Sequence, residues 1–124
     1  MPEYYVTARV MLFKDDKRTK EYPLDSKEYR KLHAEMHARG YVRYVIDDSS
    51  QVMYRLPPGE YNLEISAMDA VSARTEALSL ACAAATSSTS KHRYLTYVTG
   101  DGGRIWAQLG TFKKDPDALP DVQP

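Results

Sequence analysis

The chain has 124 residues, which fits one domain, and its 17 basic and 17 acidic residues give a formal net charge of zero. A balanced charge excludes the strongly basic class of nucleic-acid-binding domain, although it leaves a local basic patch open. The single cysteine, Cys82, excludes an intrachain disulfide and a paired-cysteine metal site, and we expect it to be a small buried apolar residue. We expect no signal peptide, no membrane segment and a cytoplasmic location, because no apolar run is long enough to span a bilayer.

Alternating side chains predict a first strand over residues 4–13. One alternate set is mostly aliphatic and should face the core. Its members are Tyr4, Val6, Ala8, Val10 and Leu12. The other set includes Tyr5 and Arg9 and suits a sheet face that is only partly covered. Charges of both signs over residues 14–25 predict a solvated loop after this strand.

A first helix is predicted from Asp25 to about Arg39. Asp25 can accept hydrogen bonds from the amides of the first turn, Glu28 completes a pattern like a capping box, and Gly40 is a natural stop. Apolar residues recur at helical spacing along one stripe, which should pack on the sheet. The stripe consists of Tyr29, Leu32, His33 and Met36.

Two further strands are predicted over residues 41–46 and 60–66, with extended chain between them up to a Pro-Pro-Gly break at 57–59. In the strand over 41–46, we place Tyr41 and Arg43 on the uncovered face of the sheet. In the strand over 60–66, alternate residues should face the core. They are Tyr61, Leu63 and Ile65.

The C-terminal half begins with a helix predicted over residues 69–86. Its expected buried seam consists of Val71, Thr75, Leu78, Cys82 and Ala85. A strand over 92–99, a glycine-rich turn over 100–103 and a short strand over 104–112 should form a hairpin. Residues 113–124, with three aspartates and three prolines, should form a flexible tail.

The order of elements predicts an α+β fold of the ferredoxin-like, split β-α-β kind, in which residues 1–112 form the domain. Each helix would connect two strands of one antiparallel sheet through a right-handed crossover. Both helices would then cover one face of the sheet, and the other face would stay open. The extra C-terminal strand could pair at a sheet edge within the chain or with a second copy, so a homodimer is one expected assembly.

Several short patterns together resemble one known family. They are Tyr29-x-x-Leu32-His33-x-x-Met36-x-x-x-Gly40-Tyr41, Asp47-Asp48, Tyr54-Arg55-Leu56-Pro57-x-x-Glu60-Tyr61-Asn62, an Ala-rich helix, Val98-Thr99 and Gly103-Arg104-x-Trp106. Over about residues 4–110 these patterns resemble the GhoS-type antitoxin family, the endoribonuclease antitoxins of type V toxin–antitoxin systems. The resemblance implies a ferredoxin-like fold similar to the Cas2-like nucleases, and cleavage of the messenger RNA of a small membrane toxin. The charged loop at 14–25 and the C-terminal tail depart from the family pattern.

Two histidines on one helix face are the candidate catalytic residues. A metal-independent ribonuclease needs a general base, a general acid and positive charge near one phosphate. His33 and His37 are four residues apart and could act there together or hold a metal, but the simpler interpretation is that His33 edges the core and His37 is solvated. Asp15 and Asp16 follow the first strand, near where Cas2-like folds place a metal-binding aspartate, but a solvated turn is the simpler interpretation. We therefore expect no metal and no cofactor.

The uncovered sheet face supplies the candidate RNA-binding residues. They are Tyr5, Arg9, Tyr41, Arg43 and, nearby, Arg55. Aromatic rings and guanidinium groups on a sheet can stack bases and neutralise the phosphates of single-stranded RNA. The same residues would also suit cross-strand packing or a dimer interface. Trp106 is expected to be a packing anchor rather than a stacking platform.

Two functions therefore compete at this point. The first is a GhoS-like endoribonuclease antitoxin that binds and cleaves single-stranded messenger RNA of a small membrane toxin. The alternative is a non-catalytic ferredoxin-like dimer that acts as a protein- or self-interaction module. The family resemblance favours the first function, and the neutral net charge favours the second.

Overall fold

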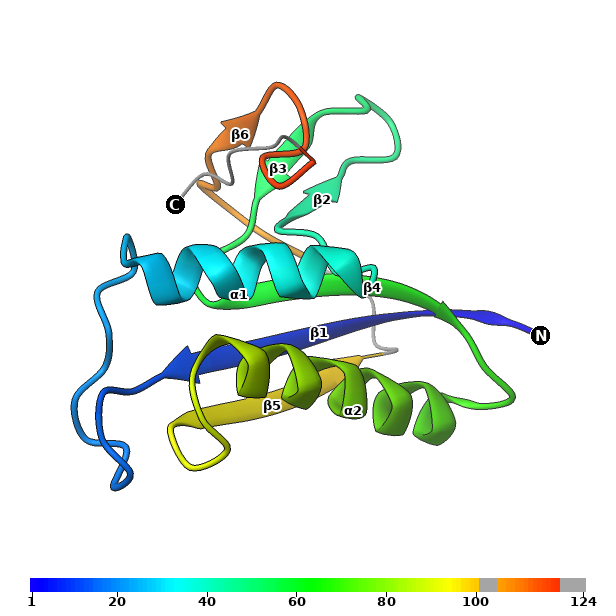
Figure 1. The fold of residues 1–124 in the computed structure, drawn as a ribbon. Coiled ribbons are helices and arrows are strands. Elements are labelled where there is room, and N and C mark those ends of the chain that lie inside the picture. The colour runs from blue at the N-terminus through cyan, green and yellow to red at the C-terminus, as the bar shows by residue number, and fades with distance from the viewer. Residues whose placement is uncertain (101–104, 119–124) are drawn as a thin grey trace.

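Two helices and two antiparallel sheets make up residues 1–100 and 105–118, which are the residues that the computed structural model describes (Figure 1). The helices are α1 (Lys27–Ala38) and α2 (Ala70–Ser88). The strands are β1 (Glu3–Leu12), β2 (Tyr44–Ile46), β3 (Met53–Arg55), β4 (Glu60–Ser66), β5 (Tyr94–Gly100) and β6 (Thr111–Phe112). The predicted α+β class is confirmed. No described helix combines the length and the apolar character that crossing a membrane requires.

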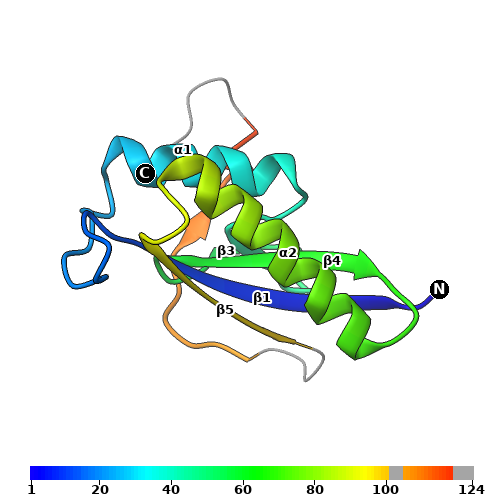
Figure 2. The same cartoon turned by 60° about the horizontal axis from the view of Figure 1, so that its bottom comes forward.

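The strand β1 lies at the centre of the first sheet, whose order is β4-β1-β5. Both neighbours run antiparallel to it, with Val6 opposite Leu63 on one side and Ala8 opposite Val98 on the other. The inward residues of β1 are only 0–1% exposed, as their alternation predicts: Val6, Ala8, Val10 and Leu12. Figure 2 shows α1 and α2 on the same face of this sheet, so the core lies between the helices and the sheet.

The helix α1 begins one residue later than predicted. Ser26, not Asp25, is the N-cap, and its hydroxyl oxygen accepts a hydrogen bond of 3.3 Å from the Tyr29 amide. A preceding turn, in which the Ser26 amide donates to the Pro23 carbonyl at 3.0 Å, sets this start. Gly40 follows the helix with a φ of +95°, so the predicted stop is confirmed. The predicted stripe is buried as well: Tyr29, Leu32, His33 and Met36.

The predicted buried seam of α2 is confirmed at Ala85 and wrong at its other residues, Val71, Thr75, Leu78 and Cys82. The buried face of this helix consists of Ala73, Ala77, Ala81, Ala84 and Ala85. Val71 and Leu78, which were expected inside, are 64% and 41% exposed, and Cys82 is only partly buried. Alanines occupy the inner face because they let the helix backbone approach its neighbours closely. One result is that the Tyr41 hydroxyl donates a hydrogen bond of 2.7 Å to a backbone carbonyl of α2, that of Ala77.

A second sheet, of order β2-β3-β6, replaces the predicted C-terminal hairpin. The strand β6 pairs with β3, with Met53 opposite Phe112, and not with β5. Residues 105–110 form no strand, and residues 101–104 of the predicted turn lie outside the described residues. Two contacts explain the different pairing: Trp106 packs on Tyr54 with ring centroids 5.5 Å apart, and the Arg55 amide donates to the Gly110 carbonyl at 2.7 Å. The expected role of Trp106 as a packing anchor fits this contact.

Residues 41–46 are shared between the two sheets. Val42 exchanges two backbone hydrogen bonds, of 2.8 and 2.7 Å, with Asn62 at the outer edge of β4. The next residues, Tyr44–Ile46, pair with β3 instead. The predicted single strand is therefore divided. Tyr41, which we placed on the uncovered face, is instead fully buried in the core between the helices and the sheet.

Candidate functional site

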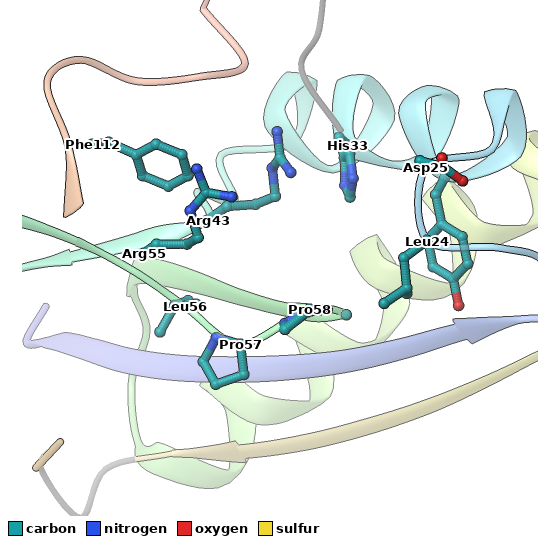
Figure 3. A pocket seen from close by; sticks show the side chains of 11 residues that line it. Leu24, Asp25, His33, Arg43, Arg55, Leu56, Pro57, Pro58 and Phe112 are labelled. Carbon is teal, nitrogen blue, oxygen red and sulfur yellow. The ribbon is translucent and has the colours of Figure 1, made fainter. Parts of the chain in front are cut away.

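Three of the predicted site residues, His33, Arg43 and Arg55, line one cavity of about 160 Å³, called the His33 pocket below. It lies between α1, the β3–β4 connection and β6. Figure 3 shows His33 projecting from α1, with Arg43 and Arg55 on one side and Leu24 on the other. The remaining lining residues are Asp25, Tyr29, Leu56, Pro57, Pro58, Gly59 and Phe112. The walls are therefore largely apolar, and most of the polar groups come from the predicted residues.

The Pro57-Pro58-Gly59 turn forms one wall of the His33 pocket. Gly59 has a φ of +82°, and a Cβ there would lie 3.2 Å from the Val10 carbonyl oxygen, so glycine suits both the conformation and the close approach. The Val10 amide donates a hydrogen bond of 2.8 Å to the Gly59 carbonyl, which ties the turn to β1. Since proline also restricts the backbone, this wall is preorganised.

His33 is buried, and its Nδ1 lies 2.6 Å from the Tyr61 hydroxyl. Burial, assisted by the nearby Arg43 charge, lowers the pKa of His33 to about 3, so the ring is neutral at pH 7. Burial also raises the pKa of Tyr61 well above its usual value, so the phenol keeps its proton. Nε2 makes no hydrogen bond to a residue within 1–100 or 105–118, and it can donate or accept one according to the tautomer.

Acidification is expected to destabilise the fold through His33. Its pKa in the folded protein, about 3, lies below the ordinary value of 6.5, so the unfolded chain takes up the proton first as the pH falls. The contribution of His33 to stability is therefore complete above about pH 6.5 and is lost progressively below it. Between pH 7 and pH 5 the loss should be about 2 kcal/mol in the free energy of unfolding.

Urea unfolding at both pH values measures this loss. His33→Gln can keep a hydrogen bond to Tyr61 but has no proton to gain, so its stability should fall less between pH 7 and pH 5. The control is His92→Gln, at an exposed loop position, whose free energy of unfolding should fall by as much as that of the unmodified chain. An equal fall for His33→Gln and the unmodified chain would contradict the assignment.

Arg43 is held by a carboxylate that sequence reasoning missed. Its Nε and Nη2 donate hydrogen bonds of 2.7 and 2.5 Å to the two carboxylate oxygens of Asp117. The Asp117 side chain is only 1% exposed and that of Arg43 only 11%, so this is a buried bidentate ion pair. Pro116 and Asp117 are thus buried against the body of the protein instead of belonging to the expected free tail, whereas residues 119–124 lie outside the described residues.

His37 lies outside the His33 pocket. Its Nε2 is 2.9 Å from a carboxylate oxygen of Asp115, and the other Asp115 oxygen accepts a hydrogen bond from the Asp117 amide. The two candidate catalytic histidines therefore have different surroundings, since His33 is directed at Tyr61 and His37 at the C-terminal segment. The structure does not bring them together around one ligand.

Arg55 reaches the pocket from the exposed side of β3. Its guanidinium lies 4.3 Å above the centre of the Phe112 ring, which is a cation–π contact between β3 and β6. Sequence reasoning missed Phe112, because the pairing of β3 with β6 was not predicted. The contact orients a positively charged group at the pocket rim while the side chain stays exposed.

The other predicted RNA-binding residues lie elsewhere. Tyr41 is buried, and burial raises the pKa of its phenol. Tyr5 and Arg9 are exposed on the face of the first sheet opposite the helices, as predicted. Tyr97 of β5 lies opposite Arg9 on this face and is 68% exposed. Alternation within residues 92–99 could have identified Tyr97 as a surface aromatic residue.

Asp15 and Asp16 take part in local structure. Asp15 accepts hydrogen bonds from the amides of Thr19 and Lys20 and from the Thr19 hydroxyl, which together lower its pKa. Asp16 forms an ion pair of 2.8 Å with Arg93, which lowers the pKa of Asp16. Across residues 1–100 and 105–118 no group of three or more His, Cys, Asp or Glu residues is arranged to hold a metal ion.

The His33 pocket combines an apolar wall with three nitrogen-bearing side chains, those of His33, Arg43 and Arg55. Asp117 offsets the charge of Arg43, so Arg55 is the more accessible cation at this pocket. Such a site can hold a planar ring against the proline turn and an anionic group at Arg55. Comparisons of the chain with protein-family models, with curated proteins and with solved structures found no match.

Proposed function

We propose that this protein binds single-stranded RNA and that the His33 pocket receives one of its nucleotides. The observation that carries the proposal is that His33, Arg43 and Arg55 line a single cavity. Pockets for whole drug-sized ligands measure about 300–1,000 Å³, so a cavity of about 160 Å³ suits a single ring better than a complete cofactor. Single-stranded RNA is recognised through such splayed-out bases together with its phosphates.

Each group would have a separate part in binding. The base would lie against the wall formed by Leu24 and the proline turn, and Nε2 of His33 would hydrogen-bond to its polar edge. Arg55 would bind the adjacent phosphate, because its guanidinium is exposed and already oriented by Phe112. Arg43 would add a fixed dipole through its pair with Asp117.

The family resemblance extends this proposal to RNA cleavage. On that basis the protein would be a GhoS-like endoribonuclease antitoxin acting in the cytoplasm on the messenger RNA of a small membrane toxin. General acid–base catalysis works best when the pKa of the group lies near the working pH. The low pKa of His33 therefore favours binding over proton transfer by this residue. Incubating labelled RNA with the protein, with and without EDTA, tests cleavage separately from binding.

The ferredoxin-like description of the fold belongs to the same proposal. It is supported by the order β4-β1-β5, by the two helices on one face, and by the pairing of Val42 at the outer edge of β4. Together these would place four chain segments in the order that a split β-α-β sheet requires. The second sheet would then be an addition at one edge.

Replacing Arg55 with alanine is expected to weaken binding of a fluorescently labelled single-stranded RNA about tenfold. It should also reduce the slope of log affinity against log salt concentration by about 1, because one phosphate contact is lost. Fluorescence anisotropy at several salt concentrations measures both effects. The matched control is Arg30→Ala, which removes the same charge from an exposed position on α1. If the two variants bind RNA equally well, the pocket is not the binding site, and if the unmodified chain does not bind RNA at low salt, the proposed function is wrong.

A further inference from the structure

The strand β5 forms an edge of the first sheet. Within the described residues it pairs only with β1, so its other side has no strand partner there. Edge strands of monomeric proteins usually carry charged residues, prolines or bulges that prevent another strand from pairing. The seven residues of β5, Tyr-Leu-Thr-Tyr-Val-Thr-Gly, contain no charged residue and no proline. This edge is therefore suited to pairing with a further strand.

The core beneath β5 is also incompletely covered. The inward residues of β1 are almost fully buried, whereas Tyr94, Thr96 and Val98 of β5 all stay partly exposed. The side of α2 next to β5 carries Cys82, which lies close to Tyr94, and along the same side Val71 and Leu78 are exposed. The β5 edge and the neighbouring side of α2, with Val71, Leu78 and Cys82, therefore leave partly exposed apolar residues that a partner can cover.

We propose that a second copy of this chain covers this surface, with β5 pairing antiparallel to β5 of the other copy about a two-fold axis at Tyr97. In that register the largest inward residue, Tyr94, is opposite the smallest, Gly100 of the second copy. Thr96 is opposite Val98, which is a favourable pair of β-branched residues. The pairing joins two three-stranded sheets into one sheet of six strands and brings the two α2 helices near each other.

This register favours a second copy as the partner, rather than an unrelated strand, because β5 is complementary to itself. Gly100 cannot be replaced by a larger residue, since a Cβ there would lie 2.6 Å from the Tyr5 carbonyl oxygen. The space opposite Tyr94 is therefore kept open by a requirement of the monomer. The seven residues of β5 carry no charge, so like charges do not face each other within this strand pair. This assembly is independent of the His33 pocket, which has no lining residue from β5 or α2.

Charge substitutions at the two-fold axis test the proposal. Tyr97 is 68% exposed, so Tyr97→Lys and Tyr97→Glu should fold, which circular dichroism verifies. Light scattering after size exclusion should give twice the chain mass of 14.1 kDa for the unmodified protein. Each variant alone should give the monomer mass, because two like charges face each other, and an equimolar mixture of both should recover the dimer mass.

The control is Met68→Lys, which adds a charge at an exposed position outside β5 and α2 and should stay dimeric. A second variant, Leu78→Glu, should weaken the dimer through the α2 side of the surface. A monomer for the unmodified protein at all concentrations would overturn the proposal. It would also be overturned by a dimer that persists in Tyr97→Lys, or by a mixture of the two charge variants that stays monomeric.

Discussion

Asp117→Ala is expected to lower the free energy of unfolding by about 3–5 kcal/mol, because it leaves Arg43 buried without its bidentate carboxylate. A small domain has only about 5–15 kcal/mol of stability in total, so the loss should be visible as a large shift of the urea midpoint. Chemical unfolding at pH 7, monitored by circular dichroism, measures it. The effect is large because both partners are removed from water in the folded protein.

Two comparisons separate this buried pair from an ordinary surface charge. Asp48→Ala removes an exposed carboxylate and should change stability by less than about 0.5 kcal/mol. The double variant Arg43→Met with Asp117→Leu removes both charges, and it should cost less than the sum of the single variants Arg43→Met and Asp117→Leu. If Asp117→Ala is as harmless as Asp48→Ala, then Asp117 is not packed against Arg43 in solution.

Ala77→Leu is expected to destabilise the protein by about 1–3 kcal/mol, although it adds apolar surface. Ala77 is fully buried, and its carbonyl accepts the Tyr41 hydroxyl hydrogen bond, so a larger side chain has to push α2 away from its neighbours. The neighbouring substitution Leu78→Ala should cost less than Ala77→Leu, because Leu78 is 41% exposed and lies outside the buried alanine face. Thermal unfolding of the two variants, compared with the unmodified chain, measures both effects.

This contrast reverses what hydrophobicity alone would predict for α2. If the largest apolar residues of α2 formed its buried face, Leu78→Ala would be the damaging change and Ala77→Leu a harmless one. Leu78→Ala costing more than Ala77→Leu would therefore show that α2 is rotated about its axis relative to the structure. At low protein concentration the comparison is free of any effect of Leu78 on dimerisation.

Much of the first sheet and α1 could be predicted because periodicity alone decides them. In β1 the aliphatic residues alternate, and in α1 the stripe from Tyr29 to Met36 has helical spacing, so only one face of each could be buried. The helix α2 could not be oriented in this way. Alanines occur on several of its faces, and close approach to the sheet favoured the smallest side chains over the largest.

The candidate site was predicted only in part, because its geometry, like the orientation of α2, depends on tertiary packing. The residue types of His33, Arg43 and Arg55 indicated ligand chemistry without any knowledge of the fold. Their partners depend on contacts between distant segments, since Asp117 is 74 residues from Arg43 and Phe112 joins β3 from beyond β5. Local propensity carries no signal for such pairings, and an acidic, proline-containing segment resembles a disordered tail until its partner is known.

The position of β6 and Asp117 near the end of the chain has a consequence for how the protein is made. Synthesis completes the three strands of the first sheet and both helices by Gly100, but β6 and Asp117 follow later. During that interval a growing chain holds Arg43 without its carboxylate and β3 with one side uncovered. A product that stops before Thr111 would thus keep its main core and yet present an open strand and Arg43 without its bidentate carboxylate. These are the features by which cellular quality control and aggregation act on incomplete chains.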